Sequence, residues 1–283
     1  MNEELMPVAR SGSRSLYKPL AGQVAFVSGS GRGLGRSIGE VLMELGADLA
    51  IHDISEDAPA QYGEFPSLTA VADAMATGDA RAVAVTGDIS SENAVNEMVE
   101  RAERKLGPIS ILVNCAGGDI GAKGGKPDPN TAVNFLLDDL QAVVNRNLIG
   151  TMLLSRAVAP GMAERQSGSI INIASIAAHY GASNEVAYAC AKAAIVHYTR
   201  CLASEVRTAG VRVNAISPGP AKSARFLATR AVDPLMMEEG PSLNRYATAS
   251  EIADVVSFLA TEQSRFVSGQ IIRVDGGAGL YAA

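Results

Sequence analysis

The feature that most constrains the fold is a regular alternation, from Gln23 onward, of short β-rich runs with longer segments of helical periodicity. This alternation predicts a parallel sheet with helices on both faces, because each crossover between parallel strands needs a connection long enough for a helix. The expected strands are residues 24–28, 48–52, 82–86, 110–113, 169–174, 211–217 and 270–274. We therefore expect one α/β domain with a doubly wound sheet of about seven parallel strands.

Helical periodicity fills most of the gaps between these runs. The clearest helices are expected near residues 34–45, 91–105, 137–164, 188–208 and 250–259. Thr248 and Glu251 have the spacing of a capping box at the start of the last helix. Three stretches, 55–78, 119–131 and 218–246, are long or rich in Gly, Pro and charge. We expect these three stretches to be loops that determine ligand specificity.

Composition excludes several classes of protein. Of the 283 residues, 47% are hydrophobic, which allows a large core, yet no apolar run reaches the roughly 18 residues of a membrane helix. The net charge of -6 disfavours a nucleic-acid partner, since binding phosphate backbones needs clustered positive surface. The three cysteines have neither metal-ligand spacing nor disulfide density, which predicts a cytoplasmic protein. Residues 1–19 are expected to form a flexible tail before a domain at 20–283, without the apolar segment of a signal peptide.

A glycine-rich loop separates the first expected strand from the first expected helix. Residues 28–35 read Ser-Gly-Ser-Gly-Arg-Gly-Leu-Gly, and such glycines let the backbone turn tightly and approach a diphosphate at the helix N-terminus. Asp53 ends the second strand, where its carboxylate can accept hydrogen bonds from both hydroxyls of an adenosine ribose. This position favours NAD, because Asp53 would repel the 2′-phosphate of NADP. Arg32 keeps NADP open, since a guanidinium can pair with that phosphate.

Tyr188 and Lys192 are four residues apart in a segment of helical character. Both side chains therefore project from one helix face. A phenol has an ordinary pKa near 10, and a nearby ammonium favours the phenolate, which suits general acid–base catalysis. The spacing alone favours packing and a solvated charge, so the remaining motifs decide its meaning.

Further motifs follow in a fixed order after the glycine loop and Asp53. They are Gly87-Asp88-Ile89, Asn114-Cys115-Ala116-Gly117, Asn147-Leu148-Ile149-Gly150, Ser175, Tyr188-Ala-Cys-Ala-Lys192, Pro218-Gly219 and Asp275-Gly276-Gly277. Together these motifs resemble the short-chain dehydrogenase/reductase family over about residues 20–277. The resemblance implies a Rossmann-like fold and an NAD(P)-dependent oxidoreductase that transfers a hydride between the cofactor and a secondary alcohol or its ketone.

The resemblance also implies a role for each residue of a catalytic set. Tyr188 is expected to be the general base in alcohol oxidation, or the acid in ketone reduction. Ser175 is expected to hydrogen-bond the same substrate oxygen, and Lys192 to lower the pKa of Tyr188 and hold the nicotinamide ribose. Asn147 is expected to anchor a water of the proton relay. We assign that role to Asn147 rather than Asn145 because Asn147 begins the Asn-Leu-x-Gly pattern.

Cofactor contacts are implied for residues spread along the chain. The expected set is Gly29, Gly31, Arg32, Gly33, Leu34, Gly35, Asp53, Asp88, Ile89, Asn114, Ala116, Gly117, Tyr188, Lys192, Pro218, Gly219 and Ser223. Cys115 replaces an asparagine often found in this motif, which puts some hydrogen bonds between strands in doubt, and Ser223 stands where threonine is frequent. No metal site is expected, because the histidines are not spaced with other ligands. The resemblance further implies a homo-oligomer, with a tetramer favoured, through helices 137–164 and 188–208.

Two other functions stay open. An NADPH-dependent ketone reductase, of the carbonyl or 3-oxoacyl type, would use the same four catalytic residues, and Arg32 favours it. A catalytically silent nucleotide-binding or scaffold protein would not need the complete set. Lys123, Lys126, Lys222 and Arg225 are interpreted as solvated loop charges, with attraction of an anionic or richly hydroxylated substrate as the alternative. The sequence does not identify the small-molecule alcohol or ketone, and it predicts no membrane partner.

Overall fold

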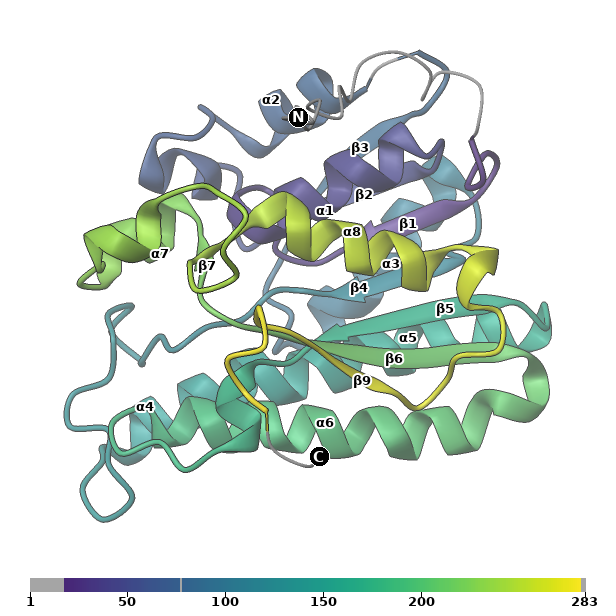
Figure 1. Cartoon of the computed structure of the whole chain (residues 1–283). Coiled ribbons are helices and arrows are strands. Elements are labelled where there is room, and N and C mark those ends of the chain that lie inside the picture. Colours follow the sequence, from purple (N-terminus) through teal and green to yellow (C-terminus); the bar gives the residue numbers. More distant parts are fainter. Residues whose placement is uncertain (1–17, 77, 281–283) are drawn as a thin grey trace, which may run out of the picture.

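The computed structural model describes residues 18–76 and 78–280, and its centre is a sheet of seven parallel strands in the order β3-β2-β1-β4-β5-β6-β9 (Figure 1). The strands are β1 (Val24–Val27), β2 (Asp48–Asp53), β3 (Ala82–Thr86), β4 (Ile111–Asn114), β5 (Gly168–Ile173), β6 (Val211–Pro218) and β9 (Ile271–Val274). Each expected strand is present with both ends within one residue of its prediction. Of the expected tail at 1–19, only Lys18 and Pro19 lie among the described residues.

Helices cover both faces of this sheet, which confirms the doubly wound Rossmann-like fold. One face carries α1 (Gly33–Glu44), α2 (Leu68–Met75) and α8 (Ala249–Ala260). The other face carries α3 (Glu92–Leu106), α5 (Gly150–Glu164) and α6 (Val186–Val206). Every strand is therefore covered on two sides, as the nearly continuous apolar strand sequences require.

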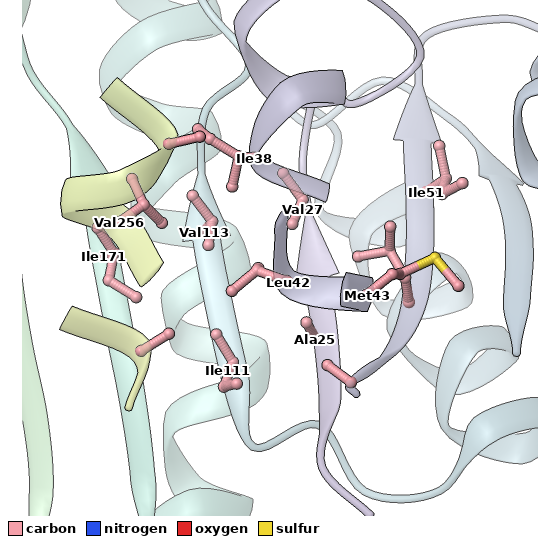
Figure 2. Packing of buried hydrophobic residues seen from close by; sticks show 14 of the residues in the cluster. Ala25, Val27, Ile38, Leu42, Met43, Ile51, Ile111, Val113, Ile171 and Val256 are labelled. Carbon is pink, nitrogen blue, oxygen red and sulfur yellow. The ribbon is translucent and has the colours of Figure 1, made fainter. Parts of the chain in front are cut away.

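Strand periodicity explains how one segment serves two cores. Successive side chains of a strand point to opposite faces, so Ala25 and Val27 of β1 lie under α1 while Phe26 lies in the opposite cluster. Figure 2 shows Ile38 and Leu42 of α1 packed over Ala25 and Val27. All five side chains are fully buried. At roughly 25 cal/mol per Å² of apolar surface, this packing is the main source of stability for the strands that carry the site.

The expected loop at 55–78 is partly wrong. It contains a 3₁₀ helix, η1 (Ala58–Tyr62), and the helix α2, which begins at Leu68 after Ser67 accepts a hydrogen bond from the Ala70 N–H at 3.0 Å. The α2 side chains Leu68 and Val71 are fully buried in the core. The second half of this segment is therefore part of the hydrophobic core rather than a loop that contacts ligand.

The other two expected loops border one end of the sheet, at the left in Figure 1. Residues 119–131 contain no helix and only an isolated bridge at Asn130. Residues 218–246 contain β7 (Ala221–Lys222), α7 (Ala224–Thr229) and η5 (Pro234–Met237), and β7 pairs with β8 (Ala247–Thr248). The predicted capping box of Thr248 and Glu251 is present at α8.

The helix expected at 137–164 is interrupted. It consists of α4 (Leu137–Val144), a π-helical turn at Asn145–Ile149, and α5. A π turn adds one residue to a helical turn and rotates the following face, and such turns are frequent at functional sites. Asn147 lies in this turn and is fully buried.

The strand order determines where a ligand can bind. The chain runs outward from β1 through β2 to β3 and then crosses back to β4 on the other side of β1. Loops leaving β1 and β4 therefore diverge, which opens a crevice beyond their carboxyl ends. Within the described ranges, no helix has the length and apolarity to cross a membrane.

Candidate active site

A cavity of about 640 Å³ lies at this crevice, between the glycine loop, the ends of β2, β4 and β5, and the segment after β6. Most of the expected site residues line it. The exceptions are Gly31, Asn114 and Asn147, which lie behind its wall. Most of the residues expected to form the site thus line one cavity, and their roles stay predictions.

The glycine loop packs too closely for side chains at two of its positions. Gly29 has a φ of +69°, and a Cβ there would lie 2.9 Å from Ala116 Cα. A Cβ at Gly35 would overlap the carbonyl oxygen of Gly29. Gly33 donates its N–H to the Glu64 carboxylate at 3.0 Å, so the N-terminus of α1 already holds an anionic group.

His52 fixes this loop. The Gly29 N–H donates to His52 Nδ1 at 3.1 Å, so Nε2 carries the proton and donates to the Gly87 carbonyl at 3.0 Å. The ring also stacks on Phe26 with centroids 5.9 Å apart. Burial lowers the pKa of His52, against a smaller opposite effect of its hydrogen bond to Gly87. The neutral tautomer is the one that holds Gly29 in place.

Asp53 is buried at the end of β2. Its Oδ1 accepts the Ile54 N–H at 2.9 Å, whereas its Oδ2 accepts no hydrogen bond from any described residue. Arg32 Nε lies 3.5 Å from Oδ2 as an ion pair, and the Arg32 guanidinium also donates to the Ala58 carbonyl and the Gln61 side chain. Arg32 is therefore committed to its own chain, and Asp53, which lines the cavity, keeps one buried oxygen without a hydrogen bond.

The central strands are joined by buried polar groups. Ser28 Oγ accepts from the N–H groups of Cys115 and Ala116 at 3.0 and 3.1 Å. Asn114 donates to Asn172 Oδ1 at 2.8 Å. The strand connection that the cysteine put in doubt is therefore made by these residues. Burial raises the pKa of Cys115 to about 12, so this thiol is an unreactive packing group.

Asp88 and Ile89 lie beside each other on the cavity wall after β3. Asp88 Oδ1 accepts two hydrogen bonds from Ser90 and closes a local turn. Ile89 packs closely against Gly150, where a Cβ would lie 2.5 Å from the Ile89 side chain. Both residues are positioned to flank a flat apolar ligand group.

Tyr188 and Ser175 meet in the cavity from different elements. Tyr188 lies in the first turn of α6, and Ser175 precedes η3 (Ile176–His179), whose Ala177 N–H it accepts at 3.2 Å. The pKa of Tyr188 is raised by burial, and the hydrogen bond with Ser175 opposes that rise. The expected lowering is therefore not found, because desolvation outweighs every stabilising partner of the phenolate.

Lys192 lies one helical turn after Tyr188, with its Nζ 5.5 Å from the centroid of the tyrosine ring. The ammonium donates to the Ile173 carbonyl at 2.7 Å. Burial, together with the positive charge of Arg225, lowers the pKa of Lys192 to about 8. Lys192 can therefore change charge within the ordinary working range of an enzyme.

Asn147 reaches the same region from behind. Its Oδ1 accepts the Gly118 N–H at 2.9 Å, and its Nδ2 donates to the carbonyls of Gly118 and Val143 at 2.9 and 2.8 Å. A Cβ at Gly117 would lie 2.5 Å from Asn147 Oδ1 and 3.3 Å from Lys192 Nζ. The side chain holds the backbone beside Lys192, and its predicted role as a water anchor stays a prediction.

The segment after β6 covers the cavity. Pro218 and Gly219 line it, and Ser223 lies above Gly33, where a Cβ would be 3.5 Å from Ser223 Cβ. Ser223 Oγ accepts the Phe226 N–H at 3.2 Å and caps α7. Arg225 was interpreted as solvated, which is wrong: its side chain lines the cavity and donates to the Gly117 carbonyl at 3.1 Å. No sequence pattern indicates which loop cation points inward.

These residues fit a bound dinucleotide. The free acceptor of Asp53 suits a ribose hydroxyl, and the N-terminus of α1, with Glu64 on it, suits a diphosphate. The cavity then continues to Ser175, Tyr188 and Lys192. One elongated ligand can therefore occupy the glycine loop while its far end lies beside the tyrosine.

Known proteins are similar to this chain over most of its length. A model of the family described as Enoyl-(Acyl carrier protein) reductase matches residues 29–279. The chain is 34% identical to a cyclohexanol dehydrogenase of Rhodococcus sp. (strain TK6), over 92% of this chain and 97% of the relative. It is 31% identical to a 3-oxoacyl-[acyl-carrier-protein] reductase of Synechocystis sp., over 93% and 99%.

A solved structure is similar to this chain over the same range of coverage. It belongs to a gluconate dehydrogenase candidate from Agrobacterium tumefaciens, with a TM-score of 0.78 and 29% identity over 91% of this chain and 96% of the other. Sheet order, glycine loop and the Tyr188–Lys192 pair accompany similarity over nearly the whole chain. The chain belongs to the short-chain dehydrogenase/reductase family of oxidoreductases.

Proposed function

We propose that this protein is an NAD-dependent dehydrogenase that oxidises a secondary alcohol to its ketone, with Tyr188 as the proton acceptor. The observation that carries the proposal is the meeting of Tyr188 and Ser175 in one cavity with Lys192, at the opposite end from Asp53. A proton-transfer group and a ribose-binding carboxylate thus lie at the two ends of a dinucleotide-sized space.

The chain's residues divide the reaction between them. Ser175 holds the substrate oxygen, and Tyr188 takes the hydroxyl proton as the carbonyl double bond forms. A bound nicotinamide ring would supply the acceptor for the hydride of the carbinol carbon. The Lys192 ammonium stabilises the phenolate that Tyr188 needs, and the proton finally passes to solvent. Asn147 keeps Gly118 and the wall beside Lys192 in place.

The state of Arg32 supports NAD rather than NADP. Its guanidinium is occupied by Asp53, Ala58 and Gln61, so little of its charge is free for a 2′-phosphate. Asp53 Oδ2 would lie against that phosphate and repel it. Steady-state rates with the two nucleotides at equal concentration test this point, and a strong preference for NADPH would contradict it.

Tyr188→Phe tests the catalytic proposal. Without the hydroxyl, the rate of alcohol oxidation should fall by about 10³-fold, because general acid–base catalysis typically contributes 10²–10⁴-fold. NADH should still bind, as a fluorescence titration would measure. Tyr198→Phe, on the same helix away from the cavity, is the matched control. Unchanged turnover in Tyr188→Phe would favour the alternative of a catalytically silent binding protein.

We also propose self-association as a tetramer through α4, α5 and α6. Exposed apolar side chains on α4 and α5 support it, namely Leu137 at 59% and Met152 at 38% exposure. Light scattering should give about four times the 29.3 kDa of one chain. A monomer at the assay concentration would contradict the proposal.

A further inference from the structure

Arg225 is held in the cavity by close backbone contacts. It lies on α7, and its Nη1 donates across the cavity to the Gly117 carbonyl at 3.1 Å. Its guanidinium lies so close to Gly118, whose φ is +135°, that a Cβ there would overlap it. The side chain therefore occupies a fitted position at the end of β4.

Arg225 is one of the cavity cations without an acidic partner among the described residues, as are Lys126, Arg146 and Lys192, whereas three others are paired. The ion pairs of these three cations are Arg32–Asp53 at 3.5 Å, Lys222–Glu239 at 2.7 Å and Arg230–Glu185 at 3.4 Å. In the described part of the chain, no carboxylate lies within 4.0 Å of the Arg225 guanidinium, and only Gly117 accepts a hydrogen bond from it. Its remaining N–H groups are free for a ligand.

The surroundings of Arg225 increase its need for an anion. Burial lowers the pKa of Arg225; Tyr62 and Tyr188 oppose this effect, and the charges of Arg32 and Arg146 add to it. An enclosed cation among other cations is unfavourable unless a negative group joins it. A guanidinium is also the side chain best shaped to bind a carboxylate with two parallel hydrogen bonds.

The position of Arg225 indicates which ligand brings that anion. A cofactor diphosphate is expected at the N-terminus of α1, where Gly33 now holds Glu64. Arg225 instead contacts Gly117, beside Lys192, and its charge acts on Tyr188. Tyr62 and Arg32, on the glycine-loop side, also act on Arg225, but the hydrogen bond to Gly117 holds its guanidinium next to the wall beside Lys192, so an anion there borders the proton-transfer group.

We propose that Arg225 binds a carboxylate of the substrate, so that the cavity selects a carboxylate-bearing secondary alcohol over the uncharged alcohol of the same skeleton. This inference rests on the proposed function. The inference adds a substrate class to the proposed function, because α7, in the segment after β6, supplies the side chain that recognises the carboxylate.

Matched alcohols test this selection. NAD-dependent oxidation is measured for cyclohexanol against cis-4-hydroxycyclohexanecarboxylate, and for 2-butanol against 3-hydroxybutyrate. In at least one of these pairs, the kcat/KM of the unaltered protein should be about tenfold or more higher for the carboxylate-bearing alcohol than for the uncharged one. Arg225→Gln should abolish that preference, mainly through KM, and Arg225→Lys should restore part of it. Arg156→Gln is the matched control, because Arg156 pairs with Glu92 on the surface and lies outside the cavity.

Three results would overturn the proposal. The first is a protein that prefers neither carboxylate-bearing alcohol to its uncharged twin. The second is an Arg225→Gln variant that loses both twins equally, since Arg225 would then only place the loop. The third is an Arg225→Gln variant whose dissociation constant for NADH rises by the same factor as its preference for the carboxylate falls. Arg225 would then bind the cofactor diphosphate.

A binding measurement separates this proposal from the proposed function. If the protein oxidises no alcohol with either nucleotide, the dehydrogenase proposal fails by itself. Calorimetry with cyclohexanecarboxylate, added to the protein saturated with NADH, then tests Arg225 without turnover. Binding that disappears in Arg225→Gln supports the carboxylate site, and equal heats from the two proteins contradict it.

Discussion

The two ends of the cavity recognise their ligands in different ways. At the glycine loop, short buried groups and backbone atoms hold each other: His52 binds Gly29, and Ser30 Oγ donates to the Val27 carbonyl at 2.6 Å. At the substrate end, long charged side chains come from segments outside the sheet, as in the Arg230–Glu185 pair. Backbone recognition suits a constant ligand, whereas side chains on loops can vary without disturbing the core.

Asp119 illustrates the second kind of recognition. It is buried between the cavity and Asn130, whose amide donates to it at 3.1 Å. Burial raises the pKa of Asp119 despite the opposing charge of Lys126. The substrate end thus contains enclosed charges that the sheet does not need, which is the pattern expected where specificity is determined.

Among changes at the cofactor end, Asp53→Asn should have the greatest effect. Asp53→Asn removes the charge that repels a 2′-phosphate and weakens the hydrogen bonds to ribose. The ratio of kcat/KM for NAD to that for NADP should fall by about 100-fold, since charge-assisted hydrogen bonds contribute about 1.5–3 kcal/mol. Steady-state rates with both nucleotides measure it. Asp48→Asn, at the other end of β2 and paired with Arg81, should leave the ratio unchanged.

The second prediction tests whether His52 makes the cofactor end rigid. His52→Phe keeps a ring against Phe26 but leaves the Gly29 N–H and the Gly87 carbonyl without partners. The dissociation constant of NADH should rise about tenfold, because an unpaired buried group costs about 1–3 kcal/mol. Fluorescence titration and thermal melting measure both effects. A variant with lower stability but normal NADH affinity would show that His52 only supports the core.

A third prediction follows from the lowered pKa of Lys192. The folded-state pKa of about 8 lies below the ordinary 10.5, so the ammonium is charged below pH 8 and lost as pH rises through that value. Affinity for NADH should therefore fall several-fold from about pH 7 to about pH 9. Lys192→Arg should flatten this dependence, since a guanidinium stays charged. A dependence that is identical in both proteins would assign it to another group.

The smallest expected effect concerns Glu64. Its carboxylate occupies the Gly33 N–H at the N-terminus of α1, so it competes with a diphosphate for that position. Glu64→Gln should tighten NADH binding by about threefold, in line with roughly 0.3–1 kcal/mol for a charge at a helix terminus. Glu100→Gln on the surface of α3 is the control. Weaker binding in Glu64→Gln would mean that Glu64 supports the loop rather than competing.

The fold was largely predictable because its signals are local and periodic. Every strand of the main sheet was expected, since apolar β-branched runs such as 24–27 and 211–218 are bounded by turn residues. The helix α2 was missed although Leu68, Val71 and Met75 have helical spacing, because only eight residues carry the pattern. The two-residue strands β7 and β8 are too short to have any period.

The candidate site divides in the same way. The glycine loop, Asp53, Ser175, Tyr188 and Lys192 lie where they were expected because their motifs are tied to strand and helix ends. His52 and Arg225 were not expected in their roles, since their partners are backbone atoms distant in sequence. The raised pKa of Tyr188 was missed as well, because desolvation depends on packing that no spacing reveals.

A crystal structure of the protein with bound NADH tests the central claim most directly, through the position of the Tyr188 hydroxyl relative to the nicotinamide ring. We expect the hydroxyl and ring carbon 4 to border one open space, close enough for a single carbinol group to contact both, with Ser175 at its edge. A hydroxyl separated from the ring by protein atoms, or directed out of the cavity, would contradict the assignment of Tyr188.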